Sequence, residues 1–165
     1  MIRTSIITIS DSVAAGTRED KSGAMLEARA RELAWKIFDK RVIADDKLTI
    51  SDAISTLANS GTIDVILSTG GTGLGPRDVT PEAIGAVADR AIPGFGEVMR
   101  AEGRKSTKFA AVSRGGAYTL GATLIVTLPG SPKGAVESLN AIADLIPHVV
   151  DLLHGRTEHP EKPSP

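Results

Sequence analysis

The chain contains no cysteine, few aromatic residues and no long hydrophobic run. The absence of cysteine excludes disulfides, thiolate catalysis and zinc held by sulfur. Aromatic residues make up only 3% of the chain, which argues against a nucleic-acid binder that stacks bases on aromatic rings. No segment approaches the roughly 20 apolar residues of a membrane span, and the apolar run in residues 1–7 is too short for a signal peptide.

The charge is nearly balanced, with 19 basic and 20 acidic residues and a net charge of -1 at pH 7. This balance gives no indication of a nucleic acid or a membrane surface as partner. A length of 165 residues suits one domain. We therefore expect a cytoplasmic protein with one domain over residues 1–155 and a flexible tail over residues 156–165.

Apolar segments with the spacing of strands and of helices alternate along the chain. We expect strands over residues 2–9, 41–44, 63–67 and 123–128. Helices are expected over residues 25–38, 49–58, 80–87, 95–103 and 132–153, the last kinked or restarted at Pro147, while residues 107–112 are ambiguous. The alternation predicts an α/β fold, a three-layer αβα arrangement around a mostly parallel sheet. Trp35 and Phe38 fit the buried or interface side of the first helix.

Polar or glycine-rich segments follow four of the expected strands. They comprise residues 10–11, 45–46, 69–78 and 129–134. The carboxyl ends of parallel strands lie at one edge of a sheet, and ligands bind outside that edge. We therefore expect these four segments to meet along one rim.

The most informative segment is STGGTGLGPRDVTPE at residues 68–82, between an expected strand and an expected helix that starts with Thr80 as N-cap. Its four glycines allow backbone N–H groups to approach an anion, which indicates a phosphate cradle. Pro76 stands where a Walker loop needs lysine, and the third glycine of the dinucleotide fingerprint is missing. The alternative is an ordinary strand-to-helix turn.

Asp78 and Asp45 are the candidate metal ligands, because Mg²⁺ prefers one or two carboxylates together with phosphate oxygens and water. Asp78 could instead accept hydrogen bonds from its own loop. Asp45 could be a solvated turn residue or could bind a ribose hydroxyl. Arg77 either serves the site or pairs with a neighbouring acid, and we expect Asp46 to be solvated.

Two further loops are candidates for substrate contacts. Residues 129–133 offer a helix N-terminus and a lysine to a phosphate or carboxylate, or form a plain capped helix start. Residues 113–116 present a hydroxyl and a guanidinium, or form a β-turn. His148, His154 and His159 are expected to lie away from the rim. With neither cysteine nor histidine in the marked loops, a nucleophilic triad is disfavoured, whereas phosphoryl or nucleotidyl transfer tolerates their absence.

Taken together, these motifs closely resemble the molybdopterin adenylyltransferase family of molybdenum cofactor biosynthesis, which includes the gephyrin G domain. The likeness rests on TGGTG and PRDVTPEA within residues 69–83, on PGFGE at 93–97 and on PGSP at 129–132. It extends to SDS at 10–12 with Gly16, to DKSG at 20–23, to residues 113–114 and to residues 159–160. Relatives can carry an amide residue at the position of Ser131.

The resemblance implies a homotrimer that transfers AMP from Mg-ATP to the terminal phosphate of molybdopterin and releases pyrophosphate. It implies that Asp45 and Asp78 are the catalytic acids and hold Mg²⁺. It assigns contacts with ATP or molybdopterin to Ser10, Ser22, Gly23, Thr69, Gly70, Gly71, Thr72, Gly73, Ser113, Arg114, Pro129, Gly130, Ser131, Pro132 and Lys133. Trp35 and residues 110–112 could contribute to a subunit contact, and a molybdenum-insertion protein is a possible partner.

Two alternatives to this enzyme remain open. One is a molybdopterin-binding carrier or scaffold without catalysis, which would bind the pterin but release no pyrophosphate. The other is a nucleotide or pyrophosphate hydrolase related to the competence-protein branch of the superfamily, which would act without any pterin.

Overall fold

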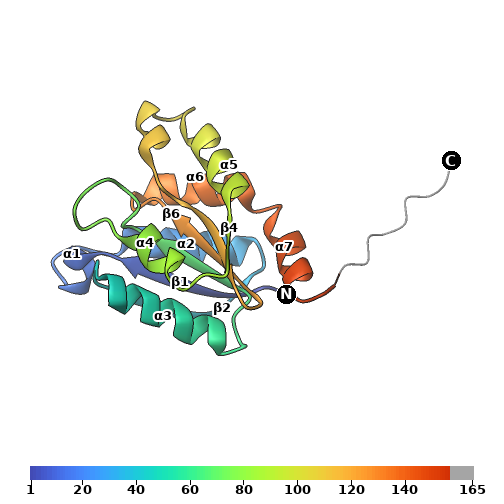
Figure 1. Cartoon of the computed structure of the whole chain (residues 1–165). Helices are drawn as coiled ribbons and strands as arrows, with labels where there is room; N and C mark the ends of the chain where they lie inside the picture. Colours follow the sequence, from blue (N-terminus) through green and yellow to red (C-terminus); the bar gives the residue numbers. More distant parts are fainter. Residues whose placement is uncertain (157–165) are drawn as a thin grey trace.

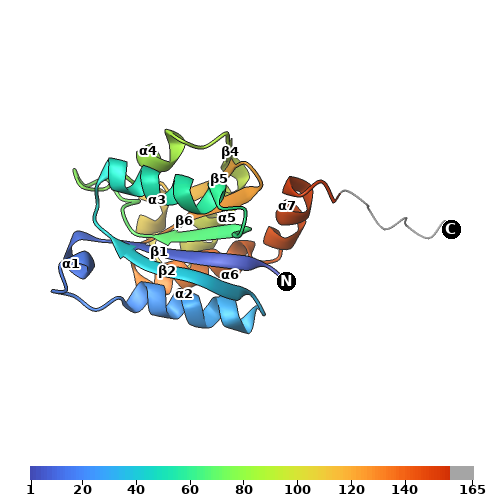
Figure 2. The ribbon, with the colours of Figure 1, turned by 90° about the horizontal axis from the view of Figure 1, so that it is seen from below.

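The computed structural model describes residues 1–156, so His159 and nearly all of the expected tail lie outside the described residues. Within that range the chain forms a six-stranded sheet with helices on both faces (Figures 1 and 2). This confirms the expected α/β class and its mostly parallel sheet. None of the helices in residues 1–156 is long and apolar enough to cross a membrane.

The sheet has the strand order β2-β1-β3-β6-β5-β4. The elements follow the chain as β1 (Arg3–Ile9), α1 (Asp11–Ala14), α2 (Lys21–Glu32), β2 (Lys36–Ile43), α3 (Lys47–Asn59), β3 (Val65–Thr69), α4 (Thr80–Gly85), β4 (Arg90–Ile92), α5 (Pro93–Gly103), the 3-10 helix η1 (Lys108–Val112), β5 (Gly116–Leu120), β6 (Thr123–Leu128), α6 (Pro132–Ile142) and α7 (Ile146–Leu153). Strands β2, β1, β3 and β6 are parallel, whereas β5 and β4 are antiparallel additions at one edge.

The central strands are buried on both faces, which explains their continuous runs of β-branched and apolar residues. All residues of β3 and β6 are buried. On one face the core packs against α2, α5, α6 and α7, and on the other against α3 and α4. Because the four parallel strands run the same way, their carboxyl ends share one edge, and this places the four polar segments along one rim as expected.

The prediction of a helix over residues 25–38 was wrong beyond residue 32. The helix ends at Glu32, and Ala34 then takes a positive φ of 59° that reverses the chain into β2. The apolar residues beyond that turn belong to an edge strand of alternating exposure, and their spacing happened to continue the helical pattern. Trp35 is buried within its own chain, with 7% of its surface exposed, and is therefore not presented to another subunit. Phe38 lies on β2, where the Lys36 ammonium covers its ring.

Other boundaries also differ from the expectations. Strands β4 and β5 were missed because they are short and depend on pairing with β6 rather than on a local apolar run. Pro93 starts α5 instead of only ending the preceding helix, and Val79 rather than Thr80 is the N-cap of α4. Asp46 caps α3 by accepting from the Thr49 amide. Helix α6 ends at Ile142, and Pro147 lies in the first turn of a restarted helix, α7.

Candidate functional site

The rim is built where the backbones of three strand ends cross in close contact. Gly70 follows β3 with a φ of +104°, and a Cβ atom there would lie 2.1 Å from the Ile9 carbonyl oxygen at the end of β1. The Gly70 amide donates to the Leu128 carbonyl at the end of β6, 3.2 Å away. A Cβ on Gly130 would be 3.3 Å from the Gly70 Cα. Glycine is therefore required at residue 70 by both conformation and space.

The carbonyl groups of residues 70–73 are all held by two other residues, Thr80 and Arg114. Thr80 Oγ1 donates to the Gly70 oxygen (2.9 Å) and the Thr80 amide to the Gly71 oxygen (3.1 Å). The Arg114 amide donates to the Thr72 oxygen and Arg114 Nε to the Gly73 oxygen, each at 2.9 Å. Each carbonyl oxygen of residues 70–73 therefore accepts a hydrogen bond from the protein itself.

The amide groups of residues 71–74 are consequently left for another acceptor. In a planar trans peptide the N–H points opposite to the preceding carbonyl, so these four amides face away from Thr80 and Arg114. None of the four donates a hydrogen bond within residues 1–156. Successive free amides of this kind form a concave anion-binding nest. We call residues 71–74 the amide nest.

The first candidate acid, Asp45, is fixed by a reciprocal pair of hydrogen bonds with Asp11. The Asp11 amide donates to Asp45 Oδ2 (2.9 Å), and the Asp45 amide donates to Asp11 Oδ1 (3.0 Å). Arg77 then donates to both Asp11 oxygens from Nε and Nη2. Arg77 therefore pairs with a neighbouring acid, one of the two roles left open by the sequence.

The second candidate acid, Asp78, folds back into the glycine loop. Its Oδ2 accepts from the Gly75 amide at 2.8 Å, and a Cβ on Gly73 or Gly75 would lie within 3 Å of that oxygen. Asp78 is half-buried, as is Asp45. The glycines at these positions leave space for the carboxylate inside the loop.

Both acids line one cavity of about 650 Å³ at the rim. The cavity is also lined by eight other predicted contact residues, namely Ser10, Ser22, Thr69, Gly70, Gly71, Gly130, Ser131 and Pro132. Arg18 and Lys21 add two cations that the sequence analysis did not single out.

Asp45 and Asp78 suit Mg²⁺ as an incomplete set of ligands, to which a bound substrate would add phosphate oxygens. Each carboxylate has one oxygen held by an amide and one oxygen without a hydrogen bond among residues 1–156. Within the same range there is no group of three or more acidic or histidine side chains that could hold a metal alone. Mg²⁺ commonly binds to one or two carboxylates and takes its remaining ligands from phosphate oxygens and water.

The surroundings of the rim shift the pKa values of Asp45 and Asp11 in opposite directions. Burial raises the pKa of Asp45, and the nearby charges of Asp11 and Asp78 raise it further, while the Asp11 amide and Arg77 lower it. The hydrogen bonds from Arg77 lower the pKa of Asp11. A cation between Asp45 and Asp78 would relieve the repulsion that raises the pKa of Asp45.

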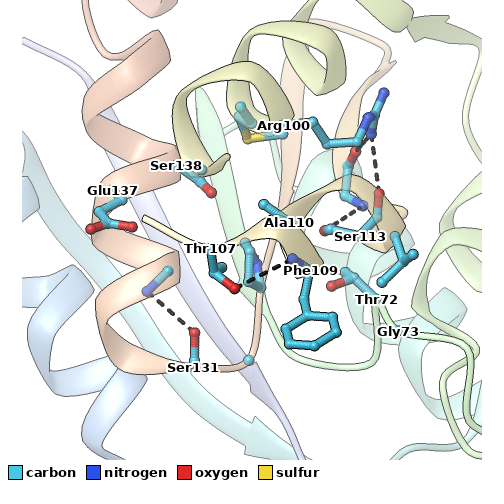
Figure 3. A pocket seen from close by; sticks show the side chains of 17 residues that line it. Thr72, Gly73, Arg100, Thr107, Phe109, Ala110, Ser113, Ser131, Glu137 and Ser138 are labelled. Atoms are coloured by element: carbon cyan, nitrogen blue, oxygen red, sulfur yellow. Dashed lines mark hydrogen bonds between the residues drawn. The ribbon is translucent and has the colours of Figure 1, made fainter. Parts of the chain in front are cut away.

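A second cavity of about 320 Å³ lies on the other side of residues 130–131, which border both spaces. Figure 3 shows Thr107, Phe109 and Ser113 on one side of it. On the other side are Ser131, the N-cap of α6, and Glu137 and Ser138 of that helix. It takes in the predicted residues Thr72, Gly73, Ser113 and Pro129. Phe109 also lines it but was missed, because the segment around η1 shows no clear sequence periodicity. Met99 and Arg100 line it as well; they lie on α5, which was predicted as a helix but given no part in the site.

Three predicted contact residues line neither cavity. Gly23 lies in the first turn of α2, where its amide donates to Asp20 and a Cβ would lie 2.2 Å from that carboxylate. Arg114 faces the back of the glycine loop. Lys133 is largely exposed, with Nζ 3.6 Å from Glu137. Direct contact of these residues with a substrate stays a prediction.

The histidines in the described range lie outside the site. His148 and His154 belong to α7 and its C-cap. His154 Nε2 lies 3.1 Å from Asp64 Oδ1, and Asp64 precedes β3 at the edge of the sheet opposite the rim. This placement agrees with the expected separation of these two histidines from the rim.

Comparison with known proteins identifies the family. Residues 5–148 match the family described as a probable molybdopterin binding domain. The chain is 36% identical to a molybdopterin adenylyltransferase of Helicobacter pylori, over 93% of this chain and 89% of that protein. It is 39% identical to a molybdenum cofactor biosynthesis bifunctional protein of Synechococcus elongatus, over 91% of this chain but only 47%, about half, of the relative's length.

Comparison with solved structures supports the same family. A molybdopterin biosynthesis enzyme from Thermus thermophilus superimposes with a TM-score of 0.88 at 40% identity, covering 98% of this chain and all of that one. The likeness extends from the glycine loop to the helices on both faces of the sheet. The chain therefore belongs to the family of probable molybdopterin binding domains of molybdenum cofactor biosynthesis.

Proposed function

We propose that the protein is a molybdopterin adenylyltransferase that uses Mg-ATP. An oxygen of the terminal phosphate of molybdopterin attacks the α-phosphorus of ATP. The bond from that phosphorus to the bridging oxygen of the β-phosphate breaks, and pyrophosphate leaves. The relative in Helicobacter pylori carries this name, and this chain spans 89% of its length.

One observation carries the proposal: the amide nest borders both cavities, with Gly71 on the same cavity as the two half-buried acids and Thr72 and Gly73 on the other. The four amides of residues 71–74 would hold phosphate oxygens, and Arg18 and Lys21 would balance further negative charge. A phosphate nucleophile is already anionic near neutral pH, so positioning and charge neutralisation account for most of the rate. The reaction therefore needs no histidine or cysteine at the rim.

Asp45 and Asp78 would hold Mg²⁺ through their unbonded carboxylate oxygens. The ion would neutralise charge on the phosphates of the bound nucleotide. The predicted residues in the two cavities would divide the nucleotide and the pterin between them, with residues 130–131 common to both spaces.

We also propose that the protein acts in the cytoplasm as a homotrimer and passes its product to a molybdenum-insertion protein. The exposed apolar side chains of η1, Phe109 and Val112, offer part of a subunit contact. Sedimentation that finds only monomer at micromolar concentration would argue against the trimer.

A pyrophosphate-coupled assay with ATP, Mg²⁺ and molybdopterin tests the enzymatic proposal. We expect one pyrophosphate for each molybdopterin converted, and none without Mg²⁺ or without the pterin. Molybdopterin binding with no pyrophosphate release would identify a carrier or scaffold instead. Pyrophosphate release without the pterin would identify a nucleotide hydrolase.

A further inference from the structure

Arg114 spans the back of the glycine loop and contacts it at both ends. Its Nε donates to the Gly73 carbonyl at 2.9 Å, and its Nη2 donates to the Asp78 carbonyl at 2.7 Å. Its backbone amide donates to the Thr72 carbonyl at 2.9 Å. The guanidinium therefore closes the turn that contains Asp78 and also fixes one end of the amide nest.

Both flanks of Arg114 are fixed in turn. Arg100 of α5 donates from Nη1 to the carbonyls of Ser113 and Gly115, the residues before and after Arg114. The third guanidinium nitrogen of Arg114, Nη1, pairs with Glu82 of α4. This pairing lowers the pKa of Glu82, which keeps the carboxylate charged. All three guanidinium nitrogens are thus used inside the protein.

A planar fork of fixed N–H groups suits this task better than a lysine ammonium. It reaches two carbonyls and a carboxylate in directions that the guanidinium plane sets. Side chains that place catalytic groups act in this way, and a displacement of about 1 Å can reduce turnover roughly 100-fold.

We propose that Arg114 is a positioning residue, which holds Asp78 and the amide nest in their productive geometry, rather than a residue that binds substrate. The proposal rests on the adenylyltransferase function proposed above. Arg114 lines neither cavity, and its proposed role in turnover is exerted through Asp78.

Steady-state kinetics of Arg114→Gln separate positioning from substrate binding. We expect kcat to fall roughly 100-fold, while the KM for molybdopterin changes less than about 3-fold. Arg114→Lys, which keeps the charge but loses the fork, should recover part of kcat. A loss confined to KM, with weaker equilibrium binding of molybdopterin, would overturn the proposal and restore Arg114 as a substrate contact.

Hydrogen exchange of the substrate-free protein tests the same geometry without turnover. The Gly75 amide is held by Asp78 Oδ2, and the Asp78 amide by the Gly75 carbonyl. In Arg114→Gln we expect both amides to exchange about 10-fold faster or more, because the turn opens locally. The Leu67 amide, in buried β3, should keep its rate and thereby shows that the fold is intact. Unchanged exchange at Gly75 and Asp78 would overturn the proposal.

Two further variants serve as controls. Glu32→Gln removes an acid that pairs with an arginine, Arg29, on the exposed face of α2, so its kcat should stay within about 3-fold of wild type. Arg31→Gln removes an arginine that pairs with Glu27 on the exposed face of α2, and should change neither readout. If the wild-type protein transfers no AMP, the proposed function fails, but the exchange comparison still decides whether Arg114 holds the turn.

Discussion

Asp11 and Asp45 exchange hydrogen bonds across the ends of β1 and β2, with the backbone amide of each donating to the side-chain carboxylate of the other at 2.9 and 3.0 Å. This reciprocal pair fixes the direction of the Asp45 carboxylate without using any other side chain. Arg77 neutralises Asp11 from the solvent side and also lowers the pKa of Asp45. The charge of Asp45 therefore depends on a residue that does not touch it.

The pH dependence of AMP transfer should report this coupling. Burial raises the pKa of Asp45 in the metal-free protein, so at subsaturating Mg²⁺, where protons compete with the ion for this acid, activity declines on acidification at a higher pH than for an ordinary aspartate. Arg77→Gln removes a charge that lowers this pKa. The acidic limb of the kcat/KM profile should therefore move to higher pH.

Arg41→Gln is the matched control for Arg77→Gln, because Arg41 makes a similar two-nitrogen contact with Asp39 on β2. Its profile should follow that of the wild-type protein. If the acidic limb of the kcat/KM profile stays in place in Arg77→Gln, or moves to lower pH, Asp45 does not control the loss of activity at low pH.

Asp78→Asn should reduce kcat by about 100-fold or more, because it removes a metal-directed charge from the cavity. The fold should survive, since the asparagine oxygen can still accept from the Gly75 amide. Asp89→Asn is a suitable control, because Asp89 Oδ2 likewise accepts one loop amide, that of Gly121. Kinetics and thermal unfolding of the two variants check the prediction, and wild-type turnover by Asp78→Asn would refute the role of this acid.

Gly70→Ala should destabilise the protein by about 3 kcal/mol or more, through a strained φ and a clash with the Ile9 carbonyl. Gly61→Ala isolates the strain, because Gly61 also has a positive φ but nothing lies within 4 Å of the added Cβ. It should cost only about 1 kcal/mol. Urea unfolding of both variants measures the difference, and equal losses would mean that the strand ends are not in close contact.

The pairing of Asp64 with Arg3, at the end of the sheet away from the rim, should make an acid-sensitive contribution to the free energy of unfolding. Burial alone raises its pKa, but the hydrogen bonds and charge of Arg3 lower it more, so the net shift is downward. A depressed pKa stabilises the fold above the ordinary aspartate value of about 3.9, and this contribution is lost as pH falls through the folded-state value. Arg3→Gln should therefore cost about 2 kcal/mol at pH 7 and less at pH 3.

Arg156→Gln is the control for Arg3→Gln, because Arg156 pairs with Asp151 in an exposed position. It should change the free energy of unfolding by less than about 0.5 kcal/mol at either pH. Urea titrations at the two pH values decide the matter. An equal loss at pH 7 and pH 3 in Arg3→Gln would show that the ion pair contributes nothing specific.

The rim was predictable from sequence because the four parallel strands must end along one edge, and Gly70 and Asp78 carry local signals of turn and charge. Arg114 and Asp11 were harder to assign. Arg114 acts on a loop that follows another strand, and Asp11 acts through its backbone amide, so neither leaves a local pattern. The edge strand β2 was partly misread as helix, because its apolar residues continued the spacing of α2.

The most direct test of the account is a ¹⁵N NMR titration with Mg²⁺ and a non-hydrolysable ATP analogue. We expect the largest shifts at the four amides of residues 71–74, which have no hydrogen-bond acceptor within residues 1–156. These shifts should weaken when Mg²⁺ is chelated and in the Asp45→Asn and Asp78→Asn variants. Shifts that avoid this segment, or that are indifferent to Mg²⁺ and to both acids, would contradict a site in which amides and carboxylates hold the nucleotide together.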